Sequence, residues 1–587
     1  MLDAIEHRGK TARHSYVDDQ AGIALGHVFA SAFQAPDEKK APQWHEDGDF
    51  VATLDGVIFN ATDFLPPELQ QQHLNRDAAG ALAHLKQSPA EFPAKLDGHY
   101  SLAIWDKNQR HLRLVRDPLG GKPLYWCHLA GKGVMIFASE LKGILAHPAV
   151  ECRLNRAAVS SYLTFGFVLA PLSIFEGIQK VFPGEILACD AAGHLRHRQF
   201  WTMPPVDPQS GMLDTFAAQV RERMIQTVAK HVEGAQQLGV YFSGGIESTI
   251  VLGVLKLLGI ADIHTFTLGF HNDPEKSRLS EDLHWAGHLA KIFGVPHHPI
   301  VIEHGHDPRP FLPPIFRQFD EPMLTPNCYT KYLLAEAAHK AGLNSCVSGS
   351  NAEPSFQRTW AKTIQKVQAG IGAHASFEEF FLFDRTKLFT LEEQAELLTE
   401  PLAETRELAF QLIRRYSEGV EAEYIGDRLD GTLLRMQDAE KALAVQDRTA
   451  ALLGMEVRHP YHDAQLFEFA NLIPARFKGS ESSEMTKAVL IAAFKDVLPN
   501  EIITRKKRGF PSYYWNRGEV DDLIQRLLSP QAVERAGIFR PDTVQRILAA
   551  DKISSKKSAG QRTWGLLVMQ AWYELYIHKN DGFLAAE

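Results

Sequence analysis

The stretch Leu238–Thr249 reads LGVYFSGGIEST and contains three kinds of local pattern. The apolar run at 238–242 carries a β-branched and two aromatic residues and predicts a buried strand, whereas apolar residues at helical spacing over 247–259 predict a helix. Between them, Ser243, Gly244 and Gly245 permit a sharp turn, because glycine adopts backbone conformations that other residues avoid. The stretch therefore predicts a strand, a glycine loop and a helix in succession.

A loop of this kind is expected to hold an anion. Its backbone N–H groups point at one place, and the positive end of the following helix faces the same place, so we expect a phosphate. The sequence lacks the Gly-Lys-Ser/Thr ending of a P-loop. The segment SGGIES at 243–248 resembles instead the Ser-Gly-Gly-x-Asp-Ser pyrophosphate loop of enzymes that cleave ATP to AMP and pyrophosphate, such as the asparagine synthetase family. A turn of a doubly wound sheet without any ligand is the alternative.

Length and composition narrow the class of protein. The chain has 587 residues, enough for two large domains or three to four ordinary ones. Its formal net charge of −9 is small for this size and argues against a nucleic-acid scaffold. Without a long apolar run or a signal-peptide pattern, we expect a cytoplasmic protein with no membrane partner. The five cysteines form no Cys-x-x-Cys pair, which argues against structural zinc.

The first third of the chain has the pattern of a layered α+β domain. Short strand-like runs at 22–33, 50–59, 100–105, 111–115, 124–127 and 135–138 are separated by polar turns, and helices are expected at 75–86 and 140–146. Five phrases resemble the glutamine amidotransferase half of asparagine synthetases: HRG at 7–9, LDG at 96–98, RDPLG at 116–120, FASE at 137–140 and GIQK at 177–180. The resemblance implies an Ntn-hydrolase-like domain over residues 1–203.

The same resemblance implies that this domain has lost its chemistry. The family's glutaminase needs an N-terminal Cys as nucleophile, whereas this chain begins with Met1 and Leu2. Val28 and Val57 stand where the family has an Arg and a Glu that hold glutamine. A Cys on a segment ahead of Met1 would supply the nucleophile but would not restore those two contacts. We therefore expect a degenerate glutamine amidotransferase-like domain.

The remainder of the chain has the pattern of an α/β domain. The proline-rich segment 201–210 is expected to be a linker, and strands at 263–270 and 297–302 alternate with helices at 212–232 and 281–293. This alternation predicts a parallel sheet with ligands at the carboxyl ends of its strands. By resemblance, residues 211–587 form an ATP-pyrophosphatase (adenine nucleotide alpha hydrolase-like) domain with a helical C-terminal part.

A second loop, SGSNAE at 348–353, resembles the family's Ser-Gly-Glu-Gly-Ala-Asp phrase, and TFTLGF at 265–270 resembles its adenine-binding phrase. The resemblance implies that ATP is bound by Ser243, Gly244, Gly245, Glu247, Ser248, Leu268, Ser348 and Gly349. Glu247 and Glu353 replace the two aspartates that bind magnesium in the family. Glutamate has the same charge as the aspartate it replaces and differs only in a longer side chain. We therefore expect both residues to bind Mg²⁺.

Two further positions are implicated in catalysis by the resemblance. Ser350 stands where the family has a carboxylate, or a Tyr in β-lactam-forming relatives, and serine is a weak base. The general base is left open among Glu378, Glu379 and the substrate. Lys507, within RKKRGF at 505–510, matches a cation that stabilises the departing pyrophosphate, with a solvated basic turn as the alternative.

Two acidic phrases each allow two interpretations. Asp320 and Glu321 match a phrase near the nucleotide but also fit a solvated acidic turn. The run around Asp447 and GMEVRHPYHD at 454–463 matches the family closely, and we expect Glu456, Arg458 and Asp463 to brace the site by ion pairs, with substrate contact as the alternative.

These features together predict an ATP-dependent ligase that adenylates a carboxylate and couples it to an amine. With glutamine handling lost, we expect the amine to lie in the same small-molecule or peptide substrate, as in lasso-peptide macrolactam synthetases and β-lactam synthetases. The lasso type is preferred, and it implies a leader-peptide-binding protein and a protease as partners. Asparagine synthetase-like amidation with ammonia or a partner glutaminase, and a non-catalytic scaffold of the same fold, are the alternatives.

Overall fold

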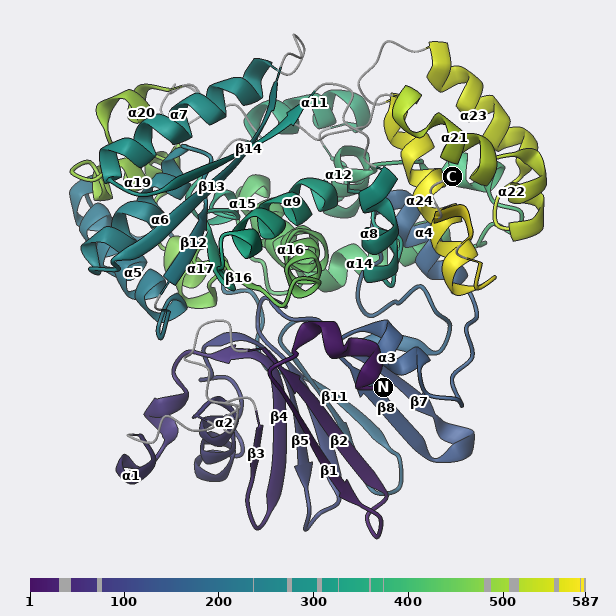
Figure 1. Cartoon of the computed structure of the whole chain (residues 1–587), viewed down its shortest axis with the longest axis horizontal. Helices are drawn as coiled ribbons and strands as arrows, with labels where there is room; N and C mark the ends of the chain where they lie inside the picture. The colour runs from purple at the N-terminus through teal and green to yellow at the C-terminus, as the bar shows by residue number, and fades with distance from the viewer. Residues whose placement is uncertain are drawn as a thin grey trace.

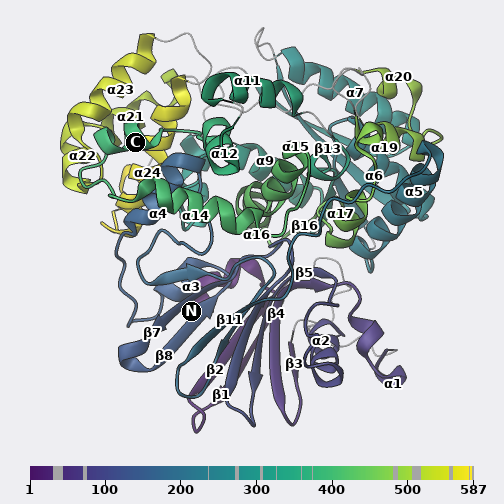
Figure 2. The same cartoon turned by 180° about the vertical axis from the view of Figure 1, so that it is seen from behind.

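The computed structural model describes the chain except for residues 31–43, 71–75, 236, 272–276, 304–308, 326, 358–359, 373, 480–486, 506–516, 554–558, 581 and 585–587. It consists of two bodies, one built mainly from strands and the other an α/β body with many helices (Figure 1, Figure 2). Within the described residues, no helix is long and apolar enough to cross a bilayer.

The first body is the expected layered α+β domain. One layer is a six-stranded antiparallel sheet in the order β11-β10-β6-β5-β4-β3, and a two-stranded sheet, β1-β2, and a three-stranded sheet, β8-β7-β9, pack against it. The strands are β1 (Ala12–Asp18), β2 (Ile23–Phe29), β3 (Trp44–Glu46), β4 (Phe50–Ile58), β5 (Gly98–Asp106), β6 (His111–Arg116), β7 (Tyr125–Leu129), β8 (Val134–Ala138), β9 (Ile178–Lys180), β10 (Glu185–Cys189) and β11 (Leu195–Gln199).

The helices of this body close its ends and its outer face. They are η1 (Asp3–Arg8), η2 (Ala61–Phe64), α1 (Pro67–Gln70), α2 (Arg76–Gln87), η3 (Ala130–Lys132), α3 (Leu141–Leu145) and α4 (Arg156–Phe165). Helix α2 buries Leu82 and Leu85 against the six-stranded sheet. Its sequence alternates with helical period, so the expected helix at 75–86 is confirmed. Helix α4 packs instead among helices of the second body.

The second body contains a five-stranded parallel sheet in the order β14-β13-β12-β15-β16. The strands are β12 (Gln237–Tyr241), β13 (Asp262–His271), β14 (His297–Glu303), β15 (Ser345–Ser348) and β16 (Glu456–Arg458). Successive residues of β12 point to opposite faces of the sheet. Val240 joins a core with α5 (Leu213–His231), α6 (Ile246–Leu257) and α19 (Ala488–Ala493), whereas Tyr241 joins a core with α8 (Leu312–Gln318), α9 (Asn327–Lys340) and α16 (Ala444–Ala451). Helices therefore cover both faces, as the sequence predicts.

The other helices belong to the second body, and those that end the chain confirm the expected helical C-terminal part. They are α7 (Ser277–Phe293), η5 (Arg309–Phe311), α10 (Glu353–Phe356), α11 (Ala361–Ile371), α12 (Phe377–Arg385), α13 (Leu391–Leu397), α14 (Thr405–Ser417), α15 (Ile425–Leu433), the π-helix η6 (Leu434–Leu443), α17 (Ala464–Ala470), α18 (Ala475–Lys478), α20 (Asn500–Thr504), α21 (Arg517–Leu527), α22 (Pro530–Ala536), α23 (Pro541–Ile553), α24 (Ala559–Tyr576) and η7 (Gly582–Leu584).

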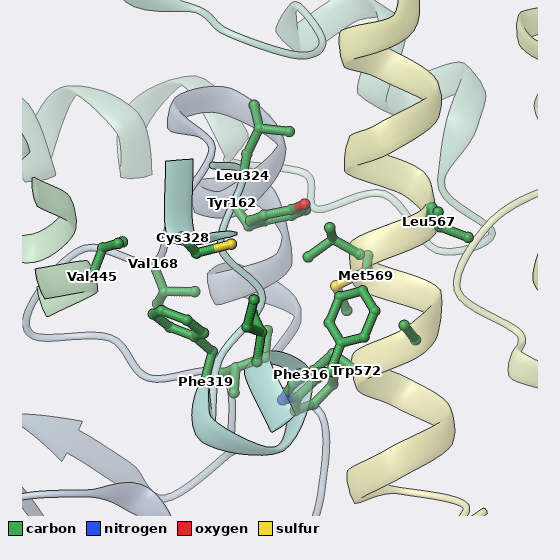
Figure 3. Packing of buried hydrophobic residues seen from close by; sticks show 14 of the residues in the cluster. Tyr162, Val168, Phe316, Phe319, Leu324, Cys328, Val445, Leu567, Met569 and Trp572 are labelled. Atoms are coloured by element: carbon green, nitrogen blue, oxygen red, sulfur yellow. The ribbon is translucent and has the colours of Figure 1, made fainter. Parts of the chain in front are cut away.

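Helix α24 fixes the C-terminal helices to the rest of the molecule. Met569 and Trp572 of α24 pack with Phe316 of α8 and Leu324 in a continuous apolar cluster (Figure 3). The same cluster contains Tyr162 of α4, whose hydroxyl donates to the Gly565 carbonyl oxygen at 2.8 Å. This core therefore joins segments from the beginning, the middle and the end of the chain.

Candidate ATP site

The glycine loop and the second loop leave the sheet side by side. Strands β12 and β15 are parallel neighbours in which Tyr241 pairs with Ser348, so both loops begin at the same edge of the sheet. At Gly349 the backbones approach so closely that an added Cβ would lie 2.7 Å from the Cα of Ser248. Two phrases about 100 residues apart in the sequence therefore form one surface, at the carboxyl ends where nucleotides bind in sheets of this type.

The glycine loop has the backbone geometry that its sequence predicts. Gly244 has φ +65°, and a Cβ there would lie 2.8 Å from the backbone nitrogen of Ala286 on α7. The Gly245 N–H donates to the Ser243 hydroxyl oxygen at 3.3 Å, and that hydroxyl lies 3.2 Å from the Ser248 hydroxyl. The loop opens directly into α6, whose first N–H groups have no carbonyl partner inside the helix and can bind an anion.

Leu268 lies on the strand next to the glycine loop. Tyr241 of β12 pairs with Phe266 of β13, so Leu268 is two residues beyond, level with the start of the loop. Its side chain is 3% exposed and belongs to the apolar core. A nucleotide could therefore meet this residue through its main chain, which agrees with the interpretation from the sequence.

The second loop is organised by its own hydroxyl groups. The Ser348 and Ser350 hydroxyls are 2.8 Å apart, and the Ser350 N–H donates to the Ser348 hydroxyl oxygen at 3.3 Å. Asn351 has φ +73°, a left-handed conformation that asparagine tolerates better than most residues. Among the described residues, the buried Nδ2 of Asn351 has no hydrogen-bond partner. This donor belongs to the second loop, two residues before Glu353, and an oxygen ligand would satisfy it.

The two carboxylates expected to bind metal both occupy first turns of helices. Glu247 is in the first turn of α6 and forms an ion pair with the ammonium of Lys487, whose side chain is 2% exposed. Glu353 begins α10 and is exposed. No cluster of three potential metal ligands is found in the described part of the chain, but Mg²⁺ in nucleotide sites needs only one or two carboxylates beside the phosphates. The two residues are oxygen donors of the kind that Mg²⁺ takes, and the carboxylate of Glu247 is already paired with Lys487.

Sequence reasoning missed Lys487. The residue has φ +67°, precedes the apolar helix α19, and its N–H donates to the Lys478 carbonyl oxygen at 2.9 Å. A lysine directly before the run AVLIAA is a weak sequence signal, because the partner that explains its burial is 240 residues away.

Lys507 lies outside the described residues, but the segment that leads to it is tied to the glycine loop. The Arg505 guanidinium donates to the Gly244 carbonyl oxygen at 3.2 Å and forms an ion pair with Asp282 of α7. The basic phrase therefore begins beside the loop that is expected to hold phosphate.

Comparison with known proteins identifies the family. The asparagine synthase family model matches residues 219–574, and the glutamine amidotransferase domain model matches residues 1–201. The chain belongs to the asparagine synthase family. It is therefore a carbon–nitrogen ligase that cleaves ATP to AMP and pyrophosphate, as the sequence predicts.

Relatives of this family match nearly the whole chain at low identity. The asparagine synthetase (glutamine-hydrolyzing) 1 of Bacillus subtilis is 24% identical over 99% of this chain and 94% of its own length. The amidase chry2 of Gibberella zeae is 22% identical over 91% and 88%, and a putative asparagine synthetase of Mycobacterium tuberculosis strain H37Rv is 23% identical over 98% and 93%. Among solved structures, the glutamine phosphoribosylpyrophosphate amidotransferase of B. subtilis, complexed with ADP and GMP, covers 66% of this chain and 89% of its own, with 13% identity and a TM-score of 0.25.

The two carboxylates considered as general base, Glu378 and Glu379, are both engaged in other contacts. Glu378 forms an ion pair with Arg414 at 3.0 Å. Although burial raises the pKa of Glu378, backbone hydrogen bonds at the start of α12 and the Arg414 guanidinium outweigh it and lower the pKa. Glu379 accepts the Ser376 N–H at 2.9 Å in a capping box. Both side chains stabilise the helix rather than serve the loops.

Lys331 of α9 is a basic group near the ends of β12 and β15. Its ammonium lies 6.0 Å from the ring centroid of Tyr241, the residue that pairs with Ser348. Burial lowers the pKa of Lys331 to about 8. At neutral pH a measurable fraction of this amine is therefore uncharged and able to accept a proton.

The acidic phrase at Asp320 is part of the junction with the first domain. Asp320 is 0% exposed and pairs with Arg448 at 3.0 Å and with Lys142 at 3.1 Å. Glu321 pairs with Lys180 at 2.8 Å and accepts the Ile174 N–H at 2.9 Å. The interpretation as a solvated turn is wrong, because both carboxylates are buried and paired with cations, two of which belong to the first domain.

The run from Glu456 to Asp463 forms the expected ion pairs. The Arg458 guanidinium bonds Glu456 at 2.9 Å and the His231 carbonyl oxygen at 2.9 Å. Asp463 pairs with Lys230 at 2.6 Å and accepts the Leu466 N–H at 2.9 Å as the cap of α17. These contacts tie the last strand of the sheet to α5.

Proposed function

We propose that this protein adenylates a substrate carboxylate and closes an amide bond with an amine of the same molecule, as lasso-peptide macrolactam synthetases do. The observation that carries the ATP half is the close approach of Gly349 to Ser248, which places the two loops side by side. The intramolecular half rests on the altered residues of the first domain.

In the first half-reaction, a carboxylate oxygen of the substrate attacks the α-phosphorus of ATP and pyrophosphate leaves. The N–H groups of the glycine loop and the first turn of α6 hold the phosphates. Lys487 and Arg505 compensate the charge that accumulates on the leaving pyrophosphate, and Lys507 is proposed as the catalytic cation for the same step. Mg²⁺, held by Glu247 and Glu353, would neutralise further phosphate charge when bound.

In the second half-reaction, the amine attacks the acyl carbon, AMP leaves and the amine gives up a proton. The Ser350 hydroxyl, fixed by Ser348, is positioned as a hydrogen-bond donor or acceptor for the substrate. We assign the proton to Lys331, because burial lowers the pKa of its amine to about 8, which leaves a fraction uncharged at neutral pH, and because the amine lies 6.0 Å from the ring centroid of Tyr241 at the end of β12. A cation there after proton transfer would also offset the charge of the departing AMP.

The first domain supports an amine that comes with the substrate. Val28 and Val57 provide no charge to hold glutamine, and Asp55 is engaged by Arg8 at 2.9 Å. Holding both reacting groups in one molecule replaces a second binding event by proximity, which can contribute about 7–11 kcal/mol of the barrier. A peptide substrate with a leader-binding protein and a protease as partners fits this chemistry. Amidation by ammonia remains the second candidate, since the family relatives are named as asparagine synthetases.

The test is ATP–pyrophosphate exchange followed by mass spectrometry. Purified protein, Mg-ATP and a candidate peptide should give exchange and a product lighter by one water, with no added ammonium. Formation of the primary amide of the acid, in which NH2 replaces OH, only when ammonium is present would support the second candidate instead. If no candidate acid supports ATP–pyrophosphate exchange, the proposed activity is wrong.

The metal is tested in the same assay. We expect Glu247→Gln and Glu353→Gln each to raise the Mg²⁺ concentration for half-maximal exchange at least about tenfold, because one carboxylate ligand is lost. Glu247→Asp and Glu353→Asp keep the charge and should stay within about threefold of the parent protein. Glu396→Gln, which alters an exposed carboxylate, is the matched control. Unchanged Mg²⁺ dependence in both Gln variants would overturn the assignment.

A further inference from the structure

One long helix connects the first domain to the helices of the ATP site. Elements α15, η6 and α16 follow each other without a break over residues 425–451, because Leu433 and Ala444 at the two joints keep helical backbone angles. The α15 end packs against α10, which begins with Glu353, and the α16 end packs against α9, which carries Lys331. We call these three elements the connecting helix.

The middle of the connecting helix is a π-helix that covers the ten residues of η6. The turns of a π-helix close from residue i to residue i+5, and in most proteins they occur as single bulges, often at functional sites. A run of this length is therefore unfavourable by itself and needs tertiary contacts to hold it. Several of these contacts come from the first domain.

The central contact is the ion pair between Arg116 of β6 and Glu440 of η6. The Arg116 guanidinium donates to a carboxylate oxygen of Glu440 at 2.8 Å, and the two side chains are 2% and 4% exposed. The same guanidinium donates to the carbonyl oxygens of Gly120, Lys122 and Val181 at 2.9–3.1 Å. The first domain therefore holds Arg116 in place, and Arg116 holds Glu440.

Contacts on both sides of Glu440 act in the same way. Near the start of η6, the buried guanidinium of Arg435 donates to the carbonyl oxygen of Pro183 at 3.1 Å. Beyond the end of η6, Asp447 of α16 accepts a hydrogen bond from Arg8 at 2.8 Å. The first domain therefore binds the connecting helix before, within and after the centre of its π-helical part.

Asp438 lies on the same π-helix, two residues before Glu440, and is close enough to Glu353 for their charges to interact. Asp438 is half-buried. Burial, followed by the charge of Glu353, raises the pKa of Asp438 to about 8, as is expected where two carboxyl groups share one region. A cation held by Glu353 would also attract the carboxyl group of Asp438.

We propose that the first domain positions the metal-binding side of the ATP site through Arg116, which holds Glu440 and thereby fixes the π-helical turns that place Asp438 beside Glu353. An α-helical turn contains fewer residues than a π-helical turn, so a return of η6 to α-helical turns would rotate Asp438 relative to Glu353. Arg116 and Glu440 are positioning residues in this proposal, because they act on the site through Asp438.

The proposal gives the first domain a role in the ligase reaction that does not depend on glutamine. It rests on the proposed function in one respect, which is that Glu353 binds Mg²⁺ beside ATP. It does not depend on which acid or amine is joined.

Binding of Mg-ATP to the full chain tests the proposal without the reaction. Isothermal titration calorimetry gives the Mg²⁺ concentration at which ATP binding is half-maximal. Glu440→Gln keeps the size of the side chain and removes its charge. We expect it to raise this concentration at least about tenfold, the size of effect known for groups that orient metal ligands. Asp438→Asn should raise it by a similar factor.

A double variant distinguishes positioning from a general loss of stability. If Glu440 acts through Asp438, Glu440→Gln combined with Asp438→Asn should give the shift of Asp438→Asn alone, within about threefold. Asp97→Asn is the matched control. It removes an ion pair with Lys230 at 2.6 Å that also joins the two domains but lies outside the connecting helix, so it should leave the Mg²⁺ dependence unchanged.

Hydrogen exchange reports on the π-helix itself. Amides of residues 434–443 should exchange faster in Glu440→Gln than in the parent protein, because the π-helical turns lose a contact. If Glu440→Gln does not fold, Arg116→Met combined with Glu440→Met replaces the whole ion pair by apolar side chains, a change that folded proteins often tolerate. This variant should show the same shift in Mg²⁺ dependence.

Three outcomes would overturn the proposal. They are an unchanged Mg²⁺ dependence in the folded variants of Glu440, shifts that multiply in the variant that combines Glu440→Gln with Asp438→Asn, and an equal shift in Asp97→Asn. Amide formation is followed separately by mass spectrometry. A parent protein that binds Mg-ATP but forms no amide would therefore refute the proposed function and leave this inference standing.

Discussion

Arg8 of the first domain and Asp447 of the second are joined by two hydrogen bonds, at 2.8 and 3.3 Å. Lys122 reaches the same carboxylate at 2.7 Å, and Arg8 continues to Asp55 and Glu140 at 2.9 Å each. The side chains of Arg8 and Asp447 are 7% and 11% exposed, so these charges are largely removed from water. The junction of the two domains therefore contains a buried ionic network in addition to apolar contacts.

Removing one member of this network should destabilise the protein strongly. For Arg8→Ala we expect a loss of about 3–5 kcal/mol in the free energy of unfolding, because Asp447, Asp55 and Glu140 lose a shared cation. Unfolding in urea, followed by circular dichroism and by tryptophan fluorescence, measures the change. Arg13→Ala breaks an exposed pair with Asp3 and should cost less than about 1 kcal/mol. Equal effects of the two variants would contradict a buried network.

The same junction predicts a loss of stability in acid. Burial, with a smaller effect of His99, lowers the pKa of His462 to about 3, whereas an unfolded histidine titrates near about 6.5. Between these pH values the unfolded chain binds a proton that the folded chain excludes, so stability falls as pH decreases, by about 1.4 kcal/mol per pH unit for this residue. The contribution is absent above pH about 6.5.

The acid dependence can be assigned by substitution. His462→Gln should reduce the slope of unfolding free energy against pH by about 1.4 kcal/mol per unit between pH 6 and 4, whatever its effect at pH 7. The variant His194→Gln, at an exposed residue, is the control and should leave the slope unchanged. An unchanged slope in His462→Gln would show that the buried imidazole does not determine the acid limit.

The sequence predicted those parts of the fold that are encoded locally. The strand, loop and helix at 238–259 combine an apolar run, two glycines and helical periodicity, and each element forms where expected. Strand β1, in contrast, reads ARHSYVD and has only half-buried and exposed residues, so it lacks the hydrophobic pattern by which strands are found.

The parts of the site that the sequence did not reveal depend on contacts between distant segments. Lys487 reaches Glu247 from a different helix, and Glu321 meets Lys180 from the other domain. A single acidic phrase carries no information about a cation 141 residues earlier in the chain, so burial of the phrase could not be predicted. The loop-to-loop contact at Gly349 was implied by family resemblance, and the structure adds the steric reason for the glycine.

Gly349→Ala should therefore separate the two loops. The added methyl group would lie 2.7 Å from the Ser248 Cα, so the second loop must move by several tenths of an ångström or more. We expect exchange of pyrophosphate into ATP to fall at least about 100-fold, since displacements near 1 Å in an aligned site have effects of that size. Gly48→Ala meets no atom within 4 Å and should leave exchange unaltered. Full activity of Gly349→Ala would show that the loops need not touch.

Lys331→Met should impair amide formation but not adenylation. The substitution keeps the length of the side chain and its apolar packing but removes the amine that we assign as proton acceptor. Adenylation does not need this proton transfer, so pyrophosphate exchange should stay within about threefold of the parent protein. Amide formation should fall at least about 100-fold, within the range that general base catalysis contributes.

The role of Lys331 as proton acceptor also predicts how the rate of amide formation in the parent protein depends on pH. With the pKa of Lys331 lowered to about 8, the active uncharged form increases as pH rises, so the rate of amide formation should climb between pH 6.5 and 8 and level off above it. In Lys331→Met this rise should disappear, whereas Lys340→Met, at the exposed end of α9, should retain it. A rise that persists without Lys331 would assign the proton to another group, such as the substrate amine itself.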